Sequence, residues 1–74
     1  MPIESLVRMA NQIGQFFEAM PDRPEALRDL AQHIQKFWEP RMRQALLVHV
    51  DQDGGEGLRD IVAEAIGRHR AMLG

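Results

Sequence analysis

The sequence predicts an all-α protein, a small four-helix arrangement with short loops. Apolar residues recur at helical spacing in four segments, and no segment alternates apolar and polar residues as a strand would. Proline or glycine separates these segments, at residues 21–24, 40 and 54–57. Because the connections are short, we expect consecutive helices to be antiparallel neighbours in an up-and-down arrangement.

Composition limits the classes of protein that this chain can belong to. Its 74 residues predict one helical domain over residues 1–74, with the thin stability margin of a small core. The net charge of −2 argues against a nucleic-acid partner, which would favour a basic excess. The chain has no cysteine, so it has no disulfide and no thiolate ligand, which favours a reducing compartment. It begins with no secretory signal pattern, and its longest apolar run, residues 45–48, is far shorter than the roughly 20 residues of a membrane span. We expect a cytoplasmic protein without a membrane partner.

The first helix is expected over about residues 3–20, where Pro21 supplies the stop. Its apolar face includes Ile3, Leu6, Val7, Ala10, Ile13, Gly14 and Phe17. Met9, Phe16 and Met20 widen this face to about half of the helix surface. One neighbour in a minimal bundle does not need so broad a face. A second contact surface is therefore expected, on another copy of the chain or on a larger partner, with Phe16 as a candidate contact.

Capping residues and turn residues place the other three helices. Asp22 followed by Pro24 and Glu25 forms a good N-terminal cap for a second helix over about residues 23–38. Pro40 begins a third helix, over about residues 40–52, which ends at Asp53-Gly54-Gly55. A fourth helix is expected over about residues 57–72, with Gly57 as its first residue.

The most informative stretch is Phe37-Trp38-Glu39-Pro40-Arg41-Met42-Arg43. It holds the only tryptophan, and two arginines at a helix start, where the helix dipole opposes positive charge. Phe37 and Trp38 fit core positions at helical spacing. Tryptophan and arginine are also the residues most enriched in interface hot spots, so Trp38, Arg41 and Arg43 are candidate partner-binding residues. The competing interpretation makes Trp38 a core residue and the arginines solvated or paired with nearby acids.

The middle of the first helix supplies three more candidate partner-binding residues. Asn11 is a mediocre helix former, and together with Gln12 it offers donors and acceptors that the helix itself does not need. Arg8 lies on the same stretch.

The residues offer little support for catalysis or metal binding. The segment Asp51–Gly57 resembles a calcium loop only superficially, because Gly55 and Val62 occupy positions where that loop needs oxygen ligands. The three histidines, His33, His49 and His69, lie on three different helices, and none is paired with another at i, i+4 spacing. Ser5 is the only hydroxyl side chain that could act as a nucleophile. We therefore expect a protein that is not an enzyme and has no catalytic, cofactor-binding or metal-binding residue.

Five segments, read in order, carry a family resemblance. They are Leu6-Val7-Arg8-Met9-Ala10-Asn11-Gln12-Ile13-Gly14, Phe16-Phe17, Pro21-Asp22-Arg23, the Phe37–Arg43 stretch and Gly54-Gly55-Glu56-Gly57-Leu58. Together they resemble the delta subunit of soluble, NAD-dependent, molybdenum-containing formate dehydrogenases, from about Leu6 to Ile66. Arg59-Asp60 departs from the family pattern, in which proline often follows the glycine-rich segment.

The resemblance implies a non-catalytic accessory subunit of a bacterial cytoplasmic complex. It implies docking on the catalytic alpha subunit, with a role in assembly or in insertion or retention of the molybdenum cofactor. The complex would carry bis-molybdopterin guanine dinucleotide, iron-sulfur clusters, FMN and NAD on its other subunits, and none of them on this chain. The alternative is a helical module that associates with itself as a homodimer and has a regulatory role.

Overall fold

All 74 residues are described by a computed structural model, in which the chain is helical and has no strand. The helices are α1 (Ile3–Glu18), α2 (Arg23–Phe37), α3 (Pro40–Asp53), α4 (Asp60–Arg68) and α5 (Arg70–Leu73). The four longer helices, α1 to α4, are joined by short loops, which confirms the predicted fold class. No helix combines the length and the apolar composition that crossing a bilayer requires.

Local sequence explains where most of these helices begin and end. The Asp22 side chain accepts a hydrogen bond from the backbone N–H of Glu25 at 3.1 Å, which caps α2 as predicted. Pro40 stands in the first turn of α3, where its missing N–H costs nothing. The helix α3 ends at Gly54, whose φ of 66° is the left-handed conformation that glycine adopts without strain.

The fourth helix differs from the prediction at both ends. It begins at Asp60 rather than at Gly57, because Gly57 has a φ of 87° and cannot be part of a right-handed helix. It stops at Arg68, and after a break at His69 the single turn α5 follows. This break turns α5 against α2, which lets Leu73 enter the core.

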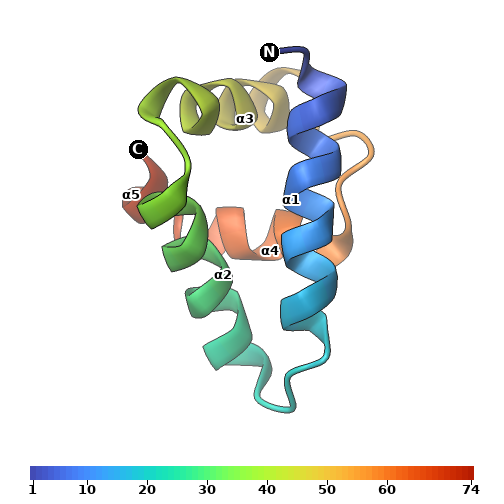
Figure 1. Ribbon diagram of the computed structural model, residues 1–74, viewed down its shortest axis with the longest axis vertical. Helices are drawn as coiled ribbons and strands as arrows, with labels where there is room; N and C mark the ends of the chain where they lie inside the picture. Colours follow the sequence, from blue (N-terminus) through green and yellow to red (C-terminus); the bar gives the residue numbers. More distant parts are fainter.

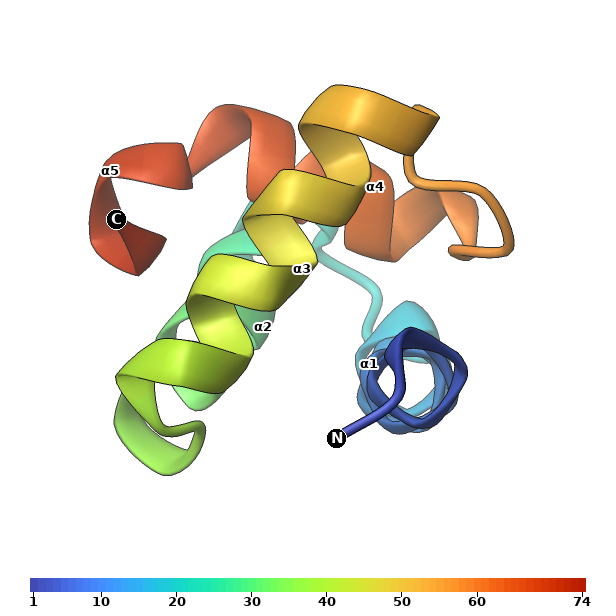
Figure 2. The same ribbon diagram turned by 90° about the horizontal axis from the view of Figure 1, so that it is seen from above.

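The helices do not form the expected up-and-down bundle. Figure 1 shows α1 and α2 as two antiparallel legs joined by the Pro21–Pro24 turn, with α3 lying across one end of them. Figure 2, seen from above, shows α4 passing beneath α3, with α5 on the far side of α3 from the N-terminus. Both α4 and α3 pack on α1, and α4 packs also on α2. The chain changes direction at Trp38 and Glu39, which are both extended, so α3 leaves α2 instead of returning along it.

One hydrophobic core joins all five helices. Its buried members are Leu6, Ala10, Ala26, Leu27, Leu30, Ile34, Trp38, Leu46, Leu47, Ile61, Val62, Ala65, Ile66 and Leu73. The helices α1 and α4 are in close contact at Gly14, where an added Cβ would lie 2.6 Å from a methyl group of Val62. The molecule measures 32 × 21 × 19 Å.

Candidate docking surface

Trp38 is part of the core and not an exposed anchor. Only 5% of its surface is exposed, and it belongs to the buried cluster. Of the two interpretations that the sequence allowed, burial favours the core residue. A partner could reach this indole only if the core opened.

Arg43 binds within its own chain. Its guanidinium donates to the carbonyl oxygens of Gln35 at 3.1 Å, Trp38 at 2.9 Å and Leu73 at 3.4 Å. Two of these carbonyls lie at the C-terminal end of α2, where the helix dipole is negative, so Arg43 caps α2 from the first turn of α3. Arg41 shares none of these contacts and is exposed. The two arginines that the sequence grouped together therefore have different environments.

Asn11 also forms its hydrogen bonds within the molecule. Its amide nitrogen donates to the carbonyl of Gly57 at 2.9 Å, and its amide oxygen accepts from the backbone N–H of Arg59 at 2.9 Å. The side chain thereby fastens the loop before α4 to the middle of α1. The Arg59 guanidinium adds an ion pair with Glu18 at 2.6 Å. Arg8 and Gln12, the other two candidates on α1, are exposed.

The clearest surface feature is a ribbon of aromatic rings that crosses from α1 to α2. Phe16 and Phe37 are each 71% exposed. Between them, Phe16 meets Phe17 edge-to-face with ring centroids 5.1 Å apart, Phe17 meets His33 at 6.1 Å, and His33 meets Phe37 at 4.7 Å. The first two pairs are edge-to-face and the third is tilted at 44°, and edge-to-face rings at these distances attract each other.

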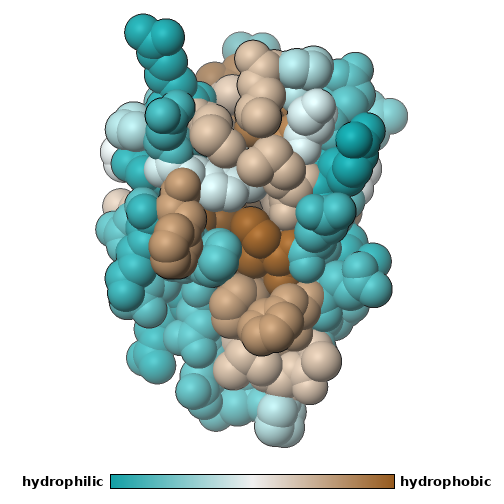
Figure 3. All heavy atoms as spheres, in the orientation of Figure 1, coloured by the Kyte–Doolittle hydropathy of each residue, from teal (hydrophilic) through white to brown (hydrophobic).

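Beside this ribbon lies an apolar groove of about 350 Å³. Its walls are formed by Gln12, Ile13, Phe16, Phe17 and His33, and none of these side chains is a carboxylate, an ammonium or a guanidinium. Figure 3 shows hydrophobic side chains gathered along the middle of this face, with hydrophilic ones on both flanks. We call the ribbon and the groove together the aromatic surface. An exposed apolar surface with a polar border is typical of a protein interaction site.

The sequence pattern indicates only part of the aromatic surface. It singled out Gln12 and Phe16, and it treated Phe37 mainly as a core residue. A signal for Phe37 was present, because neighbouring helical residues point about 100° apart and Phe37 and Trp38 cannot both face the core. His33 and Phe17 join the surface only because α1 and α2 lie side by side.

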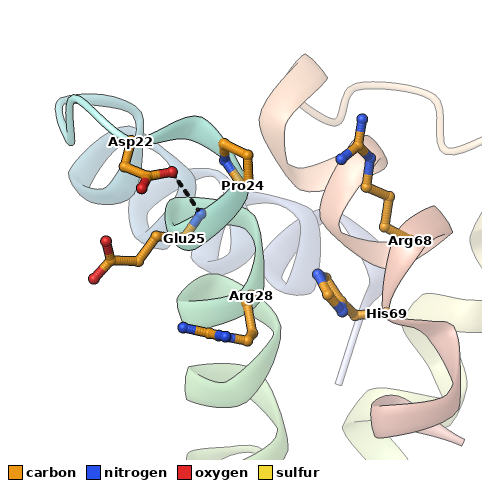
Figure 4. A pocket seen from close by; sticks show the side chains of 6 residues that line it. All are labelled: Asp22, Pro24, Glu25, Arg28, Arg68 and His69. Atoms are coloured by element: carbon orange, nitrogen blue, oxygen red, sulfur yellow. Dashed lines mark hydrogen bonds between the residues drawn. The ribbon is translucent and has the colours of Figure 1, made fainter.

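A hollow of about 610 Å³ between α2 and α4 has no hydrophobic side chain in its lining and offers no convergent site. Figure 4 shows that Glu25 and Arg28 extend to one side of it, whereas Arg68 turns away from them. Arg68 pairs with Glu64 at 3.3 Å, which in turn receives hydrogen bonds from Arg23 at 2.8 and 3.2 Å. The Arg23 guanidinium, through these hydrogen bonds and its charge, holds the pKa of Glu64 below its usual value. This cluster fastens α2 to α4 and leaves no set of donors aimed at a ligand.

Comparison with known proteins identifies the family. The model of the NADH-dependent formate dehydrogenase delta subunit family, FdsD, matches residues 5–66 of this chain. No curated protein and no solved structure matches it. The matched range contains most of α1, all of α2 and α3, most of α4 and every residue of the aromatic surface. The chain therefore belongs to the family of NADH-dependent formate dehydrogenase delta subunits.

Proposed function

We propose that this chain is a non-catalytic accessory subunit of a cytoplasmic NAD-dependent formate dehydrogenase, and that it docks on the catalytic alpha subunit. In this proposal it supports assembly of the complex, or insertion or retention of the molybdenum cofactor in the alpha subunit. The bis-molybdopterin guanine dinucleotide, iron-sulfur clusters, FMN and NAD site belong to the other subunits. Membership of the delta subunit family supports a place in the complex.

The aromatic surface carries the docking part of this proposal. Phe16 and Phe37 are exposed over most of their area, and burying such a side chain contributes about 1.5–3 kcal/mol to binding before its costs are counted. Because the groove is uncharged, it fits an apolar partner segment. A groove between two helices suits the apolar face of a third helix, here supplied by the alpha subunit. The side chains of Arg8 and Arg41 are exposed and available for polar contacts with a partner.

The residues themselves favour a role in contact over a role in chemistry. The chain has no cysteine, so it has no thiolate to ligate a cluster or to act as a nucleophile. Ser5, its one aliphatic hydroxyl, is half-buried in the first turn of α1, and no histidine or carboxylate accepts a hydrogen bond from it as a general base would. This supports the proposal that the subunit acts through a surface.

The test is a binding measurement with the purified alpha subunit. We expect Phe16→Ser combined with Phe37→Ser to weaken docking at least about tenfold, because two large apolar contacts are lost. The isolated variant should keep its helical circular dichroism and its melting temperature, since both rings are exposed. Val48→Ser is the matched control, because Val48 is 44% exposed on α3, outside the aromatic surface.

Two outcomes would contradict this assignment. Full docking by the double variant would move the interface to another face. The homodimeric regulatory module would instead be supported if the wild-type chain did not bind the alpha subunit but formed a dimer, and if the double variant did not dimerise.

A further inference from the structure

His49 is the one polar residue among the buried residues of the chain, with 8% of its surface exposed. Its Nε2 atom lies 2.8 Å from the carbonyl oxygen of Glu56. A carbonyl oxygen only accepts hydrogen bonds, so Nε2 carries a proton and donates it. In the neutral ring, the other nitrogen, Nδ1, then holds a free lone pair.

This second nitrogen is buried and has no hydrogen-bond partner. The Asp53 carboxylate, one helical turn further along α3, approaches it to 3.4 Å. A hydrogen bond between a charged imidazolium and a carboxylate would be shorter, at about 2.7–2.9 Å. In the neutral ring, two electron-pair donors thus face each other across a gap with no hydrogen bond between them.

The surroundings of this pair are acidic. A hollow of about 510 Å³ is lined by His49 and Asp53 together with Glu4 and Glu56, and no lysine or arginine lines it. Asp53 has no ion-pair partner besides His49, and neither Glu4 nor Glu56 has any, whereas Glu18, Asp51 and Glu64 elsewhere are paired with arginines. Uncompensated carboxylates around a hollow attract a cation.

We propose that a divalent transition-metal ion of the Zn²⁺ type binds between Nδ1 of His49 and the carboxylate of Asp53. Two bonds of about 2.1 Å that meet at a tetrahedral angle place their donor atoms about 3.4 Å apart, which is the separation in this structure. A metal-binding histidine usually donates its other ring N–H to a carbonyl or carboxylate, as His49 does to Glu56.

Two donors are in place, and the rest of the coordination shell forms when the ion arrives. No group of three or more histidine or acidic side chains is already gathered at metal-binding distance. Rotation of the Glu4 or Glu56 side chain into the hollow supplies a third ligand, and water supplies a fourth. In the tautomer that donates through Nε2, the lone pair of Nδ1 is the donor that the ion would use. The ion then links the end of α3 to the following loop, and through Glu4 to the first turn of α1.

The spacing of the three histidines alone does not predict this metal site. None of His33, His49 and His69 has another histidine at i, i+4 spacing. The partner of His49 is instead Asp53, at i+4 on the same helix face. The site shares no residue with the aromatic surface, so the two proposals fail or succeed independently.

The test uses the whole chain without a histidine tag, freed of metal by a chelator, and ZnCl₂ or CoCl₂ as the probe. We expect saturable 1:1 binding by calorimetry, a higher melting temperature in Zn²⁺ and the visible absorption of low-symmetry Co²⁺. Asp53→Asn removes a charged ligand from an exposed position, so the variant should stay folded and bind at least about tenfold more weakly. Asp51→Asn, on the same helix but outside the hollow, should bind as the wild type does.

Nuclear magnetic resonance of the ring nitrogens separates this site from a simple ion pair. With Zn²⁺, we expect the Nδ1 resonance of His49 to shift while those of His33 and His69 stay in place. Wild-type protein without saturable binding would overturn the proposal, as would equal binding by Asp53→Asn. The proposal would also be overturned if the His49 ring were protonated at both nitrogens and its resonances did not change with Zn²⁺. The pair would then be an imidazolium–carboxylate contact.

Discussion

Trp38 and Phe37 are neighbours in the chain with opposite environments. Trp38 is 5% exposed and Phe37 is 71% exposed, because successive residues near a helix end point in different directions. Truncating Trp38 leaves a large cavity in a small core, whereas truncating Phe37 removes a ring that mostly contacts water.

This difference makes the two residues a matched pair. We expect Trp38→Ala to lower the free energy of unfolding by about 3–5 kcal/mol, which is enough to unfold a marginal domain. Phe37→Ala should change it by no more than about 0.5 kcal/mol. Urea denaturation followed by circular dichroism measures both. Equal stability of the two variants would mean that the indole is not packed in the core.

At the same scale, Arg43 shows why single residues are hard to interpret from sequence. A guanidinium in the first turn of a helix opposes that helix's own dipole, which suggested an external partner. The structure supplies an internal one, because Arg43 caps the C-terminal carbonyls of α2 and holds the carbonyl of Leu73. Asn11 was selected for its surplus hydrogen-bonding groups, and the loop before α4 uses them. In both cases the residue type was informative, and the identity of its partner depended on the tertiary fold.

At the scale of the elements, the packing of α1 on α4 depends on a glycine. A Cβ at Gly14 would lie 2.6 Å from Val62 Cγ2 and 3.2 Å from Ile61 Cγ2, both of which are buried. Gly67, in α4, has nothing within 4 Å of the same position. The two glycines thus have similar helical backbones and different surroundings.

We expect alanine to have opposite effects at these two sites. Gly14→Ala should destabilise the chain by about 1–3 kcal/mol, because α1 and α4 must move apart. Gly67→Ala should stabilise it by about 0.5–1 kcal/mol, since alanine is the better helix former and meets no obstacle. Thermal and urea unfolding of both variants give the comparison. A stabilising Gly14→Ala would show that α1 and α4 are not in close contact.

Proline and glycine placed most element boundaries correctly, because their effects are local. Pro40 and Gly54 begin and end α3 as predicted. The start of α4 was misplaced, since Gly57 fits either a helix start or a left-handed turn and its contacts decide between them. The crossing of α3 over α1 was missed for a similar reason. Helical periodicity shows which face of a helix is apolar and not which other helix will cover it.

At the scale of the whole molecule, the chain divides its apolar residues between one core and one outer surface. The core joins all five helices, and the aromatic surface lies on α1 and α2. The sequence predicted an excess of apolar area on the first helix and therefore a second contact surface. It located only the α1 half of that surface, because the contribution of α2 depends on how the two helices pair.

The proposed accessory role makes a prediction about the complete formate dehydrogenase. A chain without cysteine has no thiolate to hold an iron-sulfur cluster, so removing it should take no electron carrier directly from the other subunits. If its contact with the alpha subunit supports or protects the cofactor site there, its loss should instead reduce how much cofactor that site retains. We therefore expect a complex prepared without this subunit to lose formate dehydrogenase activity in proportion to its molybdenum and pterin content, while iron and flavin stay near their normal levels. Elemental analysis with pterin and flavin assays, with and without the subunit, measures this.

Re-addition of the Phe16→Ser, Phe37→Ser variant should fail to restore activity where the Val48→Ser control succeeds. Full activity and full molybdenum content in the absence of the subunit would contradict a role in cofactor insertion or retention, because the alpha subunit would then acquire and keep its cofactor without help.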